Sequence, residues 1–116
     1  IVTGFGRNIS PEWPESRLLE SPSIAQAVVF GDAHPYLVAL VVPASRDIAD
    51  ETIDAAVRQA NLRLPEYARI RCWARAQEPF TAGNALATPN GRIRRDAVFR
   101  RYAERLNALY QHAELS

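Results

Sequence analysis

Two stretches of almost unbroken apolar sequence dominate the first half of the chain. Residues 24–30 and 36–42 are apolar and rich in β-branched side chains, and only the segment 31–35 separates them. An apolar run of this length predicts a strand that is covered on both faces, or on one face and by a partner. The short connection predicts that the two strands pair antiparallel.

Apolar residues at helical spacing predict two longer helices, one starting at Asp47 or Asp50 and ending before Pro65, the other over about 95–112. A shorter helix is expected from the Ser10-Pro11-Glu12 start to about Glu20, because proline suits a first turn and Pro22 stops the helix. The expected buried stripes are Ile53, Ala56, Val57, Ala60 and Leu64 in the first long helix, and Val98, Tyr102, Leu106 and Leu109 in the last.

Residues 69–76 alternate in the manner of a third strand. The two expected faces are Ile70, Cys72, Ala74 and Ala76 on the apolar side, and Arg69, Arg71, Trp73 and Arg75 on a wet or ligand-facing side. The loop that follows, 78–92, is longer than a usual connection, which predicts function or mobility there.

The expected order is a β-turn, a helix, two strands, a helix, a strand, a loop and a helix. We therefore predict an α+β fold: a small, mainly antiparallel three-stranded sheet flanked by helices and preceded by a short N-terminal β-turn or hairpin segment in residues 1–6. A length of 116 residues with 47% apolar side chains fits a single domain over 1–116.

Charge and composition narrow the chemistry. The formal net charge is +1, which is too small to hold a protein on nucleic acid or on an anionic membrane by charge alone. All 14 basic residues are arginine, and the absence of lysine excludes Schiff-base and P-loop lysine mechanisms from this chain. The chain also lacks methionine and starts at Ile1, so we expect it to be part of a longer protein.

Cysteine and histidine exclude further classes of site. Cys72 is the single cysteine, and neither His34 nor His112 has a metal-ligand spacing, so no internal disulfide and no metal site are expected. We interpret Cys72 as a small buried hydrophobe. No signal peptide or membrane-spanning stretch is visible, and a reducing, cytoplasmic setting is expected.

Three segments are candidates for binding chemistry. Glycines in residues 3–8 could bring backbone N–H groups close to an anion, or could simply form a tight turn. Residues 88–95 carry three arginines, which suits phosphate or carboxylate binding, although a solvated helix start is the plainer alternative. Arginine opposes the helix dipole there, a local conflict that favours a function. The face with Arg69, Arg71, Trp73 and Arg75 could stack on a nucleotide, or could be a solvated or covered outer face.

The first two segments together resemble the AMP-forming acyl-CoA synthetases. Residues 1–11, with a glycine, a basic residue, Asn, Ile and Pro before an acidic helix, resemble the hinge-proximal motif of that family. Residues 29–43 and 78–86 are similar to its long-chain fatty acid branch, and residues 88–95 resemble its final Gly-Lys-x-x-Arg loop. The motifs occur in family order over nearly the whole chain.

The resemblance implies a mobile C-terminal domain of a larger fatty acyl-CoA ligase, without the N-terminal domain that binds ATP and the acid. In one pose the final loop would assist acyl-adenylate formation. In the other, Gly6, with Arg7 and Asn8 beside it, would serve the thioester step. ATP with Mg2+ and CoA would be used by the full-length enzyme, and none would be bound by this chain alone. The implied partners are the N-terminal domain, fatty acid, ATP and CoA; no nucleic acid is expected, and any peripheral membrane contact would run through the N-terminal domain.

The sequence departs from the family pattern at one important position. Arg92 stands where the family has lysine, so the charge is kept while reach and fork geometry change. Adenylation would rely on Arg92 or on Arg94, or would be slow, with Arg95 supporting the loop. Two alternatives remain: a free-standing α+β nucleic-acid-binding module that uses the arginine-rich strand face, and a ligase-derived regulatory or interaction domain.

Overall fold

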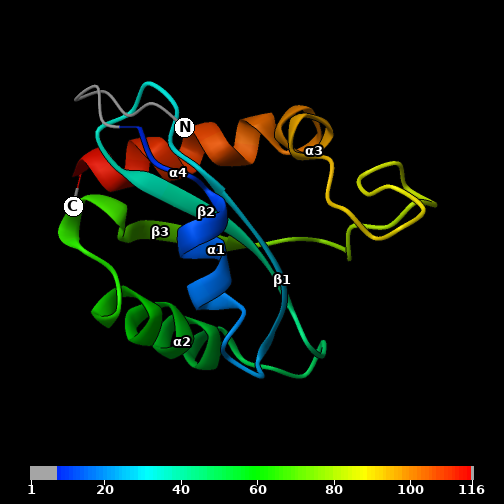
Figure 1. Ribbon diagram of the computed structural model, residues 1–116, viewed down its shortest axis with the longest axis horizontal. Coiled ribbons are helices and arrows are strands. Elements are labelled where there is room, and N and C mark those ends of the chain that lie inside the picture. The colour runs from blue at the N-terminus through cyan, green and yellow to red at the C-terminus, as the bar shows by residue number, and fades with distance from the viewer. Residues whose placement is uncertain (1–7, 116) are drawn as a thin grey trace.

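The computed structural model describes residues 8–115, and the predicted strand and glycine turn of residues 1–6 lie outside this range. The elements are α1 (Glu12–Leu18), β1 (Ile24–Phe30), β2 (Leu37–Pro43), α2 (Asp50–Leu62), the 3-10 turn η1 (Glu66–Ala68), β3 (Ile70–Arg75), α3 (Arg95–Arg101) and α4 (Ala103–Leu115). Figure 1 shows the three strands crossing the centre of the molecule, with helices on both sides.

The three strands form one sheet in the order β1-β2-β3. β1 and β2 pair antiparallel as predicted, whereas β2 and β3 run parallel because the chain crosses over through α2 before it re-enters the sheet. The predicted α+β class with a three-stranded sheet is confirmed, and the sheet itself is mixed. β2 lies in the middle, and residues 37–42 are buried throughout, which confirms the expectation from its unbroken apolar run.

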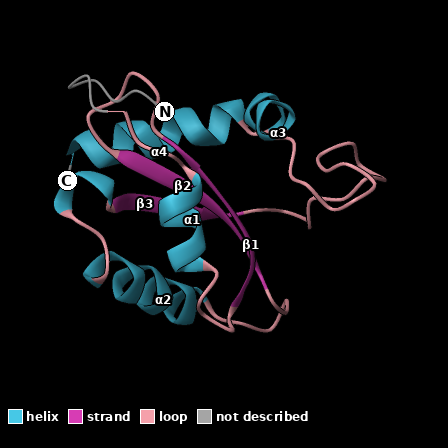
Figure 2. Ribbon diagram, viewed as in Figure 1, coloured by secondary structure: helices cyan, strands magenta, loops and turns pink. Residues whose placement is uncertain are grey.

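Two apolar layers cover the sheet, one on each face (Figure 2). On one face α1 and α2 pack through Leu18, Ile53, Val57 and Ala60. On the other face α3 and α4 pack through Val98, Tyr102, Leu106 and Tyr110, together with Phe80 and Leu86 from the long loop. Burial of these side chains is the main force that holds the layers together.

The predicted faces of the third strand are partly wrong. Cys72, Ala74 and Ala76 do share the α4 side, but Ile70 lies in the α2 layer with Trp73. The pairing of β3 with β2 shifts between Leu37 and Val38, so an irregularity at this end of the strand reverses the alternation. A strict two-residue period cannot anticipate such a shift.

The last predicted helix is divided in two. Tyr102, with φ −110° and ψ 21°, separates α3 from α4. Its N–H still donates to the Val98 carbonyl at 3.0 Å, and its carbonyl accepts from Leu106 N at 2.9 Å. The Tyr102 hydroxyl also accepts a hydrogen bond from Gln77 N at 3.2 Å, which ties the bend to the chain leaving β3.

Candidate functional site

Arg92 lies at the end of a tight turn that begins at Thr88. Gly91 N donates to the Thr88 carbonyl at 2.9 Å, and Thr88 N donates to the Arg92 carbonyl at 2.7 Å. Arg92 N in turn donates to the Thr88 hydroxyl at 3.1 Å. Gly91 has φ +86°, a conformation that glycine adopts without strain, and Pro89 presets the start of the turn. Arg92 is therefore presented by a closed, hydrogen-bonded turn.

The three arginines of this segment have different surroundings. The Arg92 side chain is exposed and makes no hydrogen bond or ion pair within the part of the chain that the structure describes. Arg94 is engaged locally, because its guanidinium donates to the Ala85 carbonyl at 3.2 Å and its backbone N to the Leu86 carbonyl at 2.8 Å. Arg92 is therefore the arginine of this loop that is available to an external anion.

Arg95 turns inward and pairs with Glu15 of α1. Its two terminal nitrogens donate to the two carboxylate oxygens at 2.5 and 3.0 Å. One of these nitrogens also donates to the Val29 carbonyl at 3.0 Å, and Val29 N donates to the Glu15 carboxylate at 2.7 Å. An arginine at the first residue of α3 is unfavourable for the helix dipole. The carboxylate of Glu15, from another helix, neutralises this charge.

The predicted hinge-proximal residues are only partly within the described range. Gly6 and Arg7 lie outside it, while Asn8 is exposed and Ile9 is buried at 2% exposure. Pro11 leads directly into α1 and so to Glu15. The structure thus links the Asn8–Pro11 run to the arginine loop through the Glu15–Arg95 pair, a juxtaposition of the first and last motifs.

A groove of about 750 Å³ runs along the same edge of the molecule. Pro11 and Arg95 line it together with Phe30, Phe99 and His34. His34 stacks on Tyr110 with ring centroids 3.6 Å apart. Burial, with smaller effects from Tyr36 and Asp32, raises the pKa of Tyr110 to about 12, so the phenol stays neutral.

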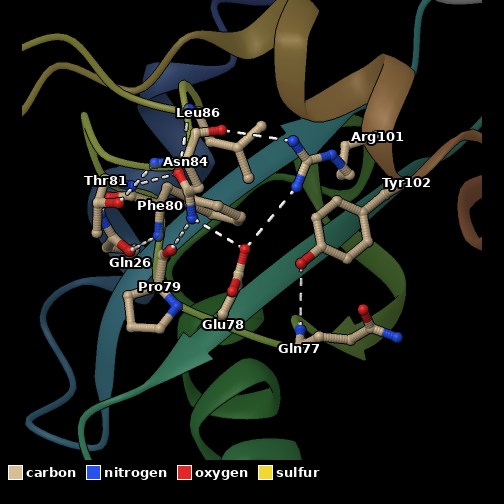
Figure 3. A network of polar contacts seen from close by, with 10 residues as sticks. All are labelled: Gln26, Gln77, Glu78, Pro79, Phe80, Thr81, Asn84, Leu86, Arg101 and Tyr102. Carbon is tan, nitrogen blue, oxygen red and sulfur yellow. Dashed lines mark hydrogen bonds and ion pairs between the residues drawn. The ribbon is translucent and has the colours of Figure 1, made fainter.

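The segment between β3 and the arginine turn is fixed by polar contacts (Figure 3). Asn84 organises it: its amide nitrogen donates to the Pro79 carbonyl at 2.8 Å and to Glu78 at 3.1 Å, and its oxygen accepts from Thr81 N at 3.0 Å and Leu86 N at 3.1 Å. Arg101 adds an ion pair to Glu78 at 3.8 Å. The base of this long loop is therefore a built support for the turn that carries Arg92.

The arginine-rich face of β3 is occupied by its own neighbours. Trp73 Nε1 donates to Asp54 at 3.1 Å, and Arg75 donates to Asp50 at 2.9 Å and to the Ile48 carbonyl at 2.5 Å. Arg69 donates to carbonyls at the end of α2 and the turn after it, each at 3.1 Å. Arg71, which is exposed, also has an interaction partner. The four residues therefore do not form one open face: Trp73 and Arg75 lie against α2 of the same chain, while Arg69 and Arg71 are exposed.

The remaining titratable candidates do not form a reactive centre. Burial raises the pKa of the half-buried Cys72 thiol, against a smaller lowering effect of Arg71, which fits the inert hydrophobe predicted from sequence. No three His, Cys, Asp or Glu side chains of the described residues come together in a group that could hold a metal ion. No helix within residues 8–115 is long and apolar enough to span a membrane.

Sequence reasoning missed two residues that organise this region. The arginine at the start of the last helix indicated that an acidic partner was needed, but nothing in the sequence identified Glu15 as that partner. No feature of the sequence indicated a role for Gln26. Its amide oxygen accepts from Phe80 N at 2.8 Å, and its amide nitrogen donates to the Phe80 carbonyl at 3.0 Å. Both contacts join segments that are distant in sequence.

Two curated proteins of similar sequence are fatty acid ligases. The long-chain-fatty-acid–CoA ligase FadD15 of Mycobacterium tuberculosis is 32% identical over 95% of this chain and 22% of its own length. The chloroplastic long-chain-fatty-acid–[acyl-carrier-protein] ligase AEE15 of Arabidopsis thaliana is 30% identical over 95% of this chain and 16% of its own length. The chain thus spans about a fifth of the length of these relatives.

A solved structure shares the fold. The A domain of carboxylic acid reductase from Segniliparus rugosus, in complex with AMP and a co-purified carboxylic acid, superimposes with a TM-score of 0.84 at 27% identity, over 100% of this chain and 20% of that chain. The sequence also matches the family described as AMP-binding enzyme C-terminal domain over residues 1–114. This chain belongs to the family of AMP-binding enzyme C-terminal domains.

Proposed function

We propose that this chain is the mobile C-terminal domain of a fatty acyl-CoA ligase, an enzyme that activates a long-chain fatty acid with ATP and transfers the acyl group from the adenylate to CoA. The family and the curated relatives support this class of reaction. One relative carries acyl carrier protein in its name, so the acceptor class shared by both is a thiol. The single observation that carries the proposal is the exposed, unengaged Arg92 on its closed turn.

Arg92 is proposed to stabilise charge during adenylation. Attack of the fatty acid carboxylate on the α-phosphorus of ATP forms the acyl–phosphate bond, and pyrophosphate leaves with the electrons of the broken bond. A fixed cation beside the phosphoryl oxygens lowers the energy of that transition state. Arginine suits this role because it is always protonated and can donate two parallel hydrogen bonds to phosphate oxygens.

Gly6, Arg7 and Asn8 are proposed to serve the second step, in which the thiol attacks the acyl carbonyl and AMP leaves. Asn8 is exposed, which supports a position facing another part of the enzyme. Arg95 is proposed to support the Arg92 loop, because its ion pair with Glu15 fixes the first residue of α3.

The residues of this chain are suited to provide some of the contacts to ATP and CoA. An exposed arginine beside a turn stabilised by backbone hydrogen bonds fits an anionic phosphate. ATP would enter as its Mg2+ complex, with the metal carried as part of the substrate. The remaining contacts to ATP, fatty acid and CoA are proposed to come from the enzyme's own N-terminal domain, so the isolated chain is expected to be inactive.

The proposal is tested by Arg92→Ala in the full-length enzyme, with the two half-reactions followed separately. Adenylation should fall by about 10²–10³-fold, the usual cost of removing one transition-state charge partner. Thioester formation from supplied acyl-adenylate should survive. Equal loss of both steps would remove the role assigned to Arg92, and an inactive full-length wild-type protein would favour a regulatory descendant of a ligase.

A further inference from the structure

Glu15 stands apart from the other charged residues of the molecule. It is the one buried charged side chain among those described, at 9% exposure, and it lies on α1 facing β1. A buried carboxylate is costly unless paired and hydrogen-bonded. Here both oxygens are used: one accepts from Arg95 and from Val29 N, and the other from the second Arg95 nitrogen.

The position of this pair in the chain matters more than its chemistry. Glu15 lies four residues after Pro11, at the end of the run that contains Asn8. Arg95 lies three residues after Arg92 and is the first residue of α3. The Val29 carbonyl and N–H hold both partners against the edge of β1. Two segments that the proposed function assigns to different steps are therefore fastened to one strand through one ion pair.

Stability alone is a weak reason for such a pair. Replacing a buried ion pair by apolar side chains is often neutral or stabilising, whereas a bidentate pair fixes relative orientation. The Arg92 side chain makes no hydrogen bond or ion pair with the described residues that would fix its direction. Its placement depends on the Thr88 turn and on where α3 begins, which Arg95 determines.

We propose that Glu15 is a positioning residue for both half-reactions: through Arg95 it sets the place of the Arg92 loop, and through α1 it sets the place of the Asn8 segment. This inference rests on the proposed function and assigns to Glu15 a role that the sequence motifs leave open. Loss of the pair displaces both segments relative to β1, and a displacement of about 1 Å costs on the order of 100-fold when a reacting group is misplaced.

The test is a double-mutant cycle in the full-length enzyme with Glu15→Gln, Arg92→Ala and the combined variant. Glu15→Gln should slow adenylation by about 10-fold or more at saturating ATP and fatty acid. In the Arg92→Ala background the same change should slow adenylation by less than about two-fold, because the group being positioned is already absent. Thioester formation from supplied acyl-adenylate should fall with Glu15→Gln in both backgrounds.

Glu20→Gln is the matched control. Glu20 lies just after α1 and pairs with Arg63 at 2.7 Å and with Arg17 at 3.0 Å, neither of which belongs to the Asn8 segment or to the Arg92 loop. Its loss should change both rates by less than about two-fold. Arg95→Lys is the second variant, since it keeps the charge but loses the fork, and it should reproduce the effect of Glu15→Gln.

The outcomes separate the two proposals. An adenylation loss from Glu15→Gln that is equal in both backgrounds would mean a merely structural role, and no loss would overturn the inference outright. Full activity of Arg95→Lys would show that charge and not geometry is needed, which also overturns it. An Arg92→Ala enzyme with normal adenylation would instead refute the proposed function.

Discussion

The side-chain amide of Gln26 pairs with the backbone of Phe80 in the way that a neighbouring strand would. It donates to the Phe80 carbonyl at 3.0 Å and accepts from Phe80 N at 2.8 Å. The Phe80 ring is 3% exposed and packs near Tyr102 in an edge-on contact. One glutamine on β1 thus anchors the start of the loop that ends at Arg92.

Gln26→Leu should destabilise the chain by about 2 kcal/mol, because a buried N–H and carbonyl lose their partners. The change is measured by denaturant unfolding of the 116-residue chain, with hydrogen exchange at the Phe80 amide as a local readout. Gln59→Leu on the exposed face of α2 is the control and should stay within about 0.5 kcal/mol. Equal effects of the two variants would contradict the anchoring role.

Gly31→Ala should destabilise the fold by about 1–3 kcal/mol. A Cβ at Gly31 would lie 2.3 Å from Leu37 Cδ2 and 3.2 Å from the Tyr36 carbonyl, and Leu37 is fully buried and has no room to move. Gly83→Ala is the control, because its Cβ would meet only the Thr81 hydroxyl at 3.6 Å. Thermal unfolding compares the two, and similar midpoints would show that the turn after β1 is looser than described.

Stability should fall at alkaline pH because of Tyr110. Its folded pKa of about 12 lies above the ordinary value of 10, so folding favours the neutral phenol. The contribution is complete below pH 10 and is lost as the pH rises through about 12. Measured from pH 8 upward, the unfolding free energy of the wild type should fall relative to that of Tyr110→Phe, which cannot ionise, as the pH rises above 10 toward about 12. A difference that does not change with pH would contradict this assignment.

The Cys72 thiol should react slowly with alkylating reagents. Burial raises its pKa, so little thiolate is present near neutral pH, and the side chain packs against the α4 layer. Iodoacetamide labelling at pH 8 should be slower than for an unstructured cysteine peptide and should reach the peptide rate in denaturant. Labelling at the peptide rate in the folded chain would mean that β3 opens readily.

Local sequence pattern predicted the elements better than it predicted their contacts. The run of residues 24–30, apolar except for Gln26, matches β1, because a largely buried strand is specified by its own composition. The face of Ile70 was predicted wrongly, because the register shift beside Leu37 depends on the partner strand. The bend at Tyr102 is accompanied by a hydrogen bond from Gln77 to the Tyr102 hydroxyl, and no periodicity in the helix reveals such a contact.

In the candidate site, too, local features could be predicted from the sequence, whereas contacts between distant residues could not. Arg92 was singled out by the resemblance of residues 88–95 to the final loop of the family, and its role stays a prediction. The sequence predicted a loop here, and the structure adds the hydrogen-bonded turn. The link between Glu15 and Arg95 joins positions 80 residues apart, and a charge pattern cannot specify such a pair without the fold. The contacts of Trp73 with Asp54 and of Arg75 with Asp50 of α2 likewise join distant parts of the chain, so the pattern of the strand could not reveal them.

The most direct test of the account is a single-turnover measurement of adenylation and thioester formation in full-length Arg92→Ala. Arg46→Ala is the matched control, since Arg46 is also exposed and lies in the separate loop between β2 and α2. Adenylation should fall by about 10²-fold or more in Arg92→Ala and not in Arg46→Ala, and thioester formation should stay within a few-fold of wild type in both variants. Adenylation at the wild-type rate, or an equal loss of both steps, would contradict it.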